Sequence, residues 1–94
     1  MVEVSELNGM KVITADAFEV GEVSGAEMGK DWKITHFHVN LSKKAAEELG
    51  FKRPLLGHVT ICLPVNLVKG IGDVITLTKE RMALKDIPEC KGRL

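Results

Sequence analysis

The fold of this chain is decided by residues 20–41, VGEVSGAEMGKDWKITHFHVNL. The pattern predicts two β-strands, residues 20–28 and 33–41, which are joined by the polar turn Gly29-Lys30-Asp31 just before the only tryptophan, Trp32. Gly21 and Gly25 stand four residues apart on one face of the first strand. Glycines inside a strand are typical of bulges or sharp bends, so this strand is expected to coil.

The second strand alternates between an apolar face and a polar one. The apolar face carries Thr35, Phe37, Val39 and Leu41, and the opposite face carries Ile34, His36, His38 and Asn40. Such alternation is typical of a half-buried antiparallel strand. A histidine-rich outer face on such a strand indicates either a site or an interface.

The remaining sequence predicts a small, mainly β domain with one helix. Further strands are expected at residues 11–14, 58–63 and 73–78. Ser42 is a suitable N-cap for a short helix over residues 43–49, and Gly50 allows a left-handed stop. A last helical turn over residues 79–86 is expected to pack Met82 and Leu84, with residues 89–94 frayed.

Length and cysteine content limit how the chain can be stabilised. Its 94 residues form one domain, 1–94, with the core at about 5–79 and a C-terminal turn and tail at 80–94. The charged N-terminus contains no secretory segment, which predicts a cytoplasmic protein with both cysteines reduced, Cys62 as a buried inert thiol. The apolar run 59–68 is too short to span a bilayer. Self-association is the remaining source of stability.

Five short motifs follow one another along the chain: DAFEVGEV at 16–23, WKITH at 32–36, GHV at 57–59, LP at 63–64 and IGDVITL at 71–77. In this order they resemble a PRC-barrel domain, most closely its stand-alone archaeal members. The chain departs from the family pattern at Ala17, where many members have glycine, so a different turn type is possible there. The resemblance implies a strongly bent six-stranded β-barrel with a short helix between its halves.

The same resemblance implies a role in docking on other proteins. The stand-alone archaeal members are similar to cell-division adaptors that pair with the membrane-anchor protein SepF. The chain is therefore expected to be a non-enzymatic adaptor and a homodimer, with a SepF-like division protein as a possible partner. The alternative is a ribosome- or RNA-associated accessory protein resembling the C-terminal barrel of RimM. Only the basic half, residues 51–94, favours it, and its dispersed charges make nucleic-acid binding the weaker expectation.

Metal binding and catalysis are weighed against this docking role. His36 and His38 point to the same side and could share an ion, with His58 or Cys62 completing the site. No carboxylate or CxxC pair lies nearby in sequence, so the expectation is no metal and no cofactor. A nucleophilic Cys62 would need a base, and His58 lies too far along the strand. We expect no enzyme activity.

Exposed apolar side chains locate the expected interface. A barrel this small cannot bury every apolar residue beside its core, and exposed apolar patches mark interfaces. The simpler alternative is that Leu63 and Val68 close the end of the barrel. The interaction residues predicted from the sequence are Ile34, His36, His38, Leu63, Val65, Leu67 and Val68.

Overall fold

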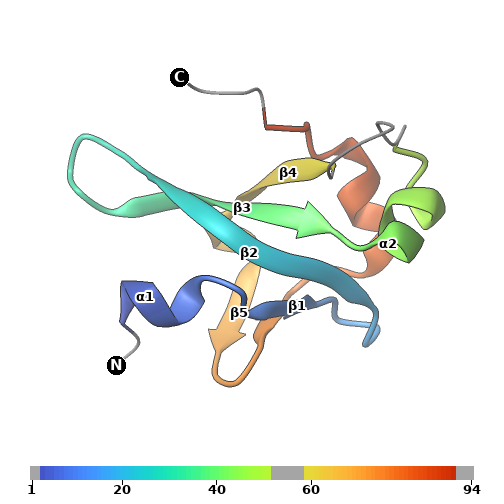
Figure 1. Cartoon of the computed structure of the whole chain (residues 1–94), viewed down its shortest axis with the longest axis horizontal. Helices are drawn as coiled ribbons and strands as arrows, with labels where there is room; N and C mark the ends of the chain where they lie inside the picture. The colour runs from blue at the N-terminus through green and yellow to red at the C-terminus, as the bar shows by residue number, and fades with distance from the viewer. Residues whose placement is uncertain (1–2, 52–58, 91–94) are drawn as a thin grey trace.

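The structure is a computed structural model that describes residues 3–51 and 59–90. One six-stranded sheet forms the molecule, in the order β4-β3-β2-β1-β6-β5 (Figure 1). The strands are β1 (Lys11–Ile13), β2 (Glu19–Met28), β3 (Ile34–Leu41), β4 (Thr60–Pro64), β5 (Val68–Ile71) and β6 (Ile75–Leu77). The helical elements are α1 (Val4–Leu7), α2 (Lys43–Glu48), and the 3-10 helices η1 (Val65–Leu67) and η2 (Arg81–Asp86).

The β2–β3 hairpin confirms the central prediction from the sequence. The apolar face of β3 is buried at Phe37, Val39 and Leu41, whereas the opposite face is half-buried. The register of β2 against β3 shifts between Val23 and Gly25, and again between Glu27 and Met28. The first shift places a bulge beside Gly25, as predicted, and it lets the long strand coil.

The halves of the chain meet where β1 pairs with β6 in parallel, Val12 opposite Ile75. All other named strand pairs of the described residues are antiparallel. The sequence pattern does not predict β5, because Gly70 interrupts the alternation of apolar and polar residues. The register of β5 against β6 shifts beside this glycine. No pairing of the described residues joins β4 to β5, so a closed barrel is not confirmed.

The helix α2 forms where the sequence predicts it. The Ser42 hydroxyl accepts a hydrogen bond from the Ala45 N–H at 3.1 Å, which caps the first turn. Gly50 has φ +78°, and the Phe51 N–H reaches the Ala46 carbonyl at 2.9 Å. These bonds, with the Gly50 N–H to the Glu47 carbonyl, make a Schellman motif.

The C-terminal segment differs from the prediction. It forms the 3-10 helix η2, in which residues three apart share a face, so Leu84 and Ile87 are both buried. Met82 was expected to pack beside Leu84, but it faces away and is 55% exposed. Residues 89–94 were expected to be frayed, but of these the described residues 89–90 run along β4, with Ile61 bridged to Glu89.

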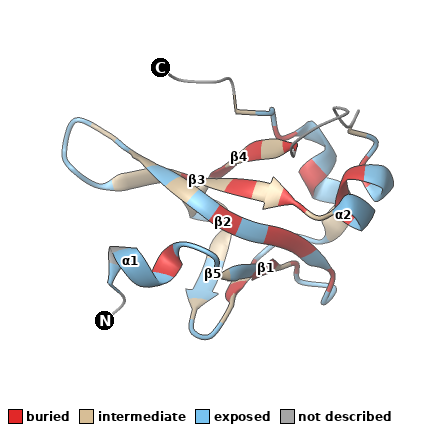
Figure 2. Ribbon diagram, viewed as in Figure 1, coloured by how far each residue is buried: buried red, intermediate tan, exposed pale blue. Residues whose placement is uncertain are grey.

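The core is built from buried side chains of the sheet, of α2 and of the C-terminal segment (Figure 2). Its largest fully buried side chains come from β3, β4, β6 and η2, and they are Phe37, Ile61, Leu63, Ile75, Leu77 and Leu84. None of the helices in the described ranges is long and apolar enough to cross a membrane.

Candidate functional site

Cys62 and Cys90 form a disulfide, with their Cα atoms 5.0 Å apart. This corrects the prediction that both cysteines are reduced thiols and that Cys62 is an inert core residue. Cys62 is half-buried and lies on the outer face of β4, opposite His38 of β3. The disulfide therefore belongs to the histidine-rich face singled out in the sequence.

Backbone pairing along β4 brings the two cysteines together. The Cys62 N–H donates to the Pro88 carbonyl at 3.1 Å, and the Cys90 N–H donates to the Thr60 carbonyl at 2.8 Å. This contact could not be predicted from the sequence, because residues 88–90 have no strand pattern. The pairing becomes possible because β4 is the edge strand of the sheet.

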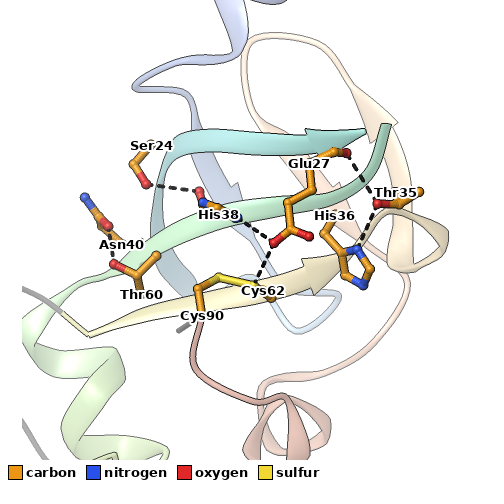
Figure 3. The surroundings of a disulfide bond; sticks show 9 residues. All are labelled: Ser24, Glu27, Thr35, His36, His38, Asn40, Thr60, Cys62 and Cys90. Atoms are coloured by element: carbon orange, nitrogen blue, oxygen red, sulfur yellow. Dashed lines mark hydrogen bonds and ion pairs between the residues drawn. A yellow bond between two sulfur atoms is a disulfide. The ribbon is translucent and has the colours of Figure 1, made fainter. Parts of the chain in front are cut away.

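Glu27 and His38 complete a polar cluster around the disulfide (Figure 3). His38 Nε2 donates to Glu27 Oε2 at 2.8 Å, and the same oxygen lies 3.3 Å from Cys62 Sγ. The two side chains are 26% and 33% exposed, so the cluster is half-buried and open to solvent. Its members come from β2, β3, β4 and the C-terminal segment.

A glycine faces the histidine of this cluster across the hairpin, at a distance that an ordinary side chain would also allow. Gly25 pairs with His38, and a Cβ at Gly25 would lie 3.7 Å from His38 Nδ1. Glu27 is two residues further along β2, on the same side of the strand, so its carboxylate reaches His38 across the hairpin. The bulge that follows Glu27 in the register of β2 comes where the hairpin narrows to its turn.

The donor atoms of Glu27, His38, Cys62 and Cys90 all lie within 4.8 Å of one another. The prediction from the sequence joined His38 to His36 instead, and it missed both Glu27 and Cys90. His36 is not among the four; its Nδ1 lies 3.0 Å from the Thr35 hydroxyl. His58 lies outside the described residues. Of the two missed residues, Glu27 could have been found from the sequence, because a hairpin that turns at residues 29–32 places it across from the histidines.

The predicted interaction residues are mostly part of the molecule's own packing. Leu63 is 1% exposed, so it belongs to the core, and its assignment to an exposed patch was wrong. The other apolar members pack half-buried against the core: Ile34, Val65, Leu67 and Val68. An interface built on these residues stays a prediction, and the described structure offers a more exposed apolar feature.

That feature is the tip of the β2–β3 hairpin, which extends beyond the neighbouring strands (Figure 1). Trp32 is 82% exposed and Met28 is 56% exposed. The Trp32 N–H donates to the Gly29 carbonyl at 3.1 Å, and the Gly29 N–H donates to the Lys33 carbonyl at 2.9 Å. Trp32 has φ +66°, in the left-handed region that suits glycine or asparagine.

A second polar feature joins the turn after β1 to the start of η2. Arg81 Nε donates to Asp16 Oδ2 at 2.9 Å, the Arg81 N–H donates to Asp16 Oδ1 at 3.0 Å, and the guanidinium lies 4.3 Å from the Phe18 ring centroid. Hydrogen bonds from the Thr14 hydroxyl and then from Arg81 lower the pKa of Asp16 to about 2. Ala17 has φ +63°, so the turn keeps the conformation that glycine would favour.

Comparison with known proteins adds no assignment to this geometry. No protein-family model matches the chain, and no curated protein matches it.

Proposed function

We propose that this chain is a non-enzymatic protein-interaction adaptor whose partner binds the tip of the β2–β3 hairpin. The exposed indole of Trp32 is the observation that supports it. An 82% exposed tryptophan contributes little to the core, and its left-handed backbone costs roughly 1 kcal/mol. A residue that costs stability and is left in solvent is well suited to a binding contact.

The surroundings of Trp32 favour a protein partner. Lys30, Asp31 and Lys33 flank the indole and are all exposed, so the tip offers an apolar centre with charges of both signs around it. Tryptophan is enriched in the few residues that dominate protein interfaces, and a polar rim around them is typical. The resemblance to archaeal PRC-barrel adaptors points to the same role, with a SepF-like division protein as the partner class.

The described basic residues give the alternative, an RNA-associated protein, little support. Arg81 is engaged by Asp16 and by Glu48, 3.5 Å from its Nη1. Lys69, Lys79 and Lys85 are exposed but are spread over β5, the segment between β6 and η2, and η2. Outside the described residues lie Lys52, Arg53, Lys91 and Arg93. A docked strand of nucleic acid would need a continuous basic track with stacking side chains.

Affinity purification with matched baits tests the adaptor proposal. The wild-type chain, Trp32→Ala and Met82→Ala are each immobilised, because Met82 is also an exposed large apolar residue but lies far along the chain from the hairpin. We expect a SepF-like protein to be retained by the wild type and Met82→Ala and to bind Trp32→Ala at least about tenfold more weakly. Equal retention by all three baits would overturn the role of the hairpin tip.

Self-association and location complete the proposal. The chain is proposed to form a homodimer, which light scattering would report as a mass of about twice 10.3 kDa; the monomer mass at every concentration would exclude it.

The protein is also proposed to be cytoplasmic, although the disulfide removes the argument from reduced cysteines. Intracellular disulfides occur in redox-active proteins and in proteins of hyperthermophiles.

A further inference from the structure

We propose that the group of Glu27, His38, Cys62 and Cys90 is a redox-gated zinc site, which binds one Zn²⁺ per chain when the Cys62–Cys90 disulfide is reduced. This goes beyond the adaptor role and does not depend on it. The four residues come from separate segments, and the sheet register and the terminal pairing bring their donor atoms together.

The donor set fits zinc better than it fits magnesium or calcium. Two thiolates, one imidazole and one carboxylate make four ligands, and zinc takes sulfur, nitrogen and oxygen donors in tetrahedral sites. Magnesium and calcium prefer sites made of oxygen atoms. His38 turns Nε2 toward the cluster, where it already lies 2.8 Å from Glu27 Oε2.

The spacing of the atoms requires only small side-chain movements. With zinc–sulfur distances of about 2.3 Å, two thiolates of a tetrahedral site stand roughly 3.8 Å apart. Cutting the disulfide frees both sulfurs to separate by rotation of their side chains, while β4 and residues 88–90 keep their backbone pairing. The other donor atoms are already within 4.8 Å of the sulfurs.

The local chemistry also favours the reduced state as the binding form. A disulfide sulfur carries no proton, so the 3.3 Å approach of Glu27 Oε2 to Cys62 Sγ is not a hydrogen bond in the oxidised chain. In the reduced chain, the Cys62 thiol can donate to that oxygen. When zinc replaces the two thiol protons, its two positive charges offset the two thiolates, and the bound site keeps the single negative charge of the carboxylate.

The redox step balances with a dithiol as the reductant. Two thiol–disulfide exchanges break the Cys62–Cys90 bond, the dithiol becomes a disulfide as it gives up two electrons, and its two protons move to the cysteine sulfurs. Zinc then forms two zinc–sulfur bonds and releases both protons to solvent. Each member of the cluster is half-buried, so a small reductant has access to the bond.

Cobalt titration of the full chain tests the site. The chain is reduced with a water-soluble phosphine, which becomes its oxide with oxygen from water and adds no competing thiol. We expect one Co²⁺ per chain, with the thiolate-to-cobalt absorption and tetrahedral bands, and displacement by one Zn²⁺. The oxidised chain should bind at least about 100-fold more weakly.

Two matched histidine variants separate the site from chance binding. His38→Gln should lower the affinity at least tenfold, whereas His36→Gln, on the same face of the same strand, should bind like the wild type. At one zinc concentration, zinc should also raise the melting temperature of the reduced wild type more than that of reduced His38→Gln, a readout that needs no cysteine variant. Absence of thiolate-to-cobalt absorption in the reduced chain, or equal losses in both histidine variants, would overturn the proposal.

Discussion

At the scale of single residues, Gly21 shows how closely two strands can approach. A Cβ at Gly21 would lie 1.9 Å from the Asn40 carbonyl oxygen, which belongs to the backbone and cannot turn away. We expect Gly21→Ala to lower the free energy of unfolding by roughly 2–4 kcal/mol, measured by urea denaturation. Gly25→Ala is the control, since its Cβ would make an ordinary 3.7 Å contact. Equal losses in both variants would contradict this interpretation.

The lowered pKa of Asp16 predicts how the stability of the fold changes at acidic pH. Its folded pKa is lowered from 3.8 to about 2, first by the Thr14 hydroxyl and then by Arg81. A lowered folded pKa stabilises the native state fully above the unfolded pKa, and this contribution is lost as the pH falls from about 4 to 2. Asp16→Asn should therefore lower the melting temperature at pH 7 and flatten its fall between pH 4 and pH 2. If the melting temperature of Asp16→Asn fell between pH 4 and pH 2 as steeply as that of the wild type, Asp16 would contribute nothing to the acid dependence.

At the scale of elements, a substitution in the turn of the β2–β3 hairpin should change the stability of the fold and the binding of the partner in opposite directions. Trp32 occupies a left-handed position, so Trp32→Gly should raise the free energy of unfolding by about 0.5–1 kcal/mol while it weakens partner binding. Chemical denaturation measures the first effect, and the bait comparison measures the second. A loss of stability in Trp32→Gly would mean that the indole packs on the hairpin and is not reserved for a partner.

The strand β3, the helix α2 and the strand β5 show which elements can be predicted from sequence patterns. The alternation in residues 34–41 is strict, so the burial of Phe37, Val39 and Leu41 follows from it directly. In α2, the cap Ser42 and the stop Gly50 are local signals, and both act as expected. The strand β5 has no such signal, because it is four residues long and contains Gly70.

At the scale of the whole molecule, long-range contacts account for what the sequence could not predict. His38 and Cys62 were recognised as candidates, but Glu27 and Cys90 were not joined to them. The contact of Cys90 with Thr60 depends on a segment that pairs with an edge strand without a strand pattern of its own. Likewise, Arg81 meets Asp16 across 65 residues, which only the assembled sheet brings together.

The disulfide should contribute strongly to the stability of a domain this small. It closes a loop with a sequence separation of 28 residues, which contains β5, β6 and η2. In the chain-entropy account, cross-linking a loop of this length stabilises the fold by about 3–4 kcal/mol. We therefore expect reduction in metal-free buffer to lower the free energy of unfolding by roughly 2–4 kcal/mol in urea denaturation.

Cys90→Ser provides the control for this prediction, because it lacks the bond and should unfold at the same urea concentration with or without the phosphine. Its stability should match that of the reduced wild type. An oxidised wild type no more stable than Cys90→Ser would mean that the backbone pairing of residues 88–90 with β4 holds the C-terminal segment by itself. In that case the two sulfurs would serve to bind zinc and would not stabilise the fold as a disulfide. Zinc would then stabilise the reduced chain only by the free energy of its own binding.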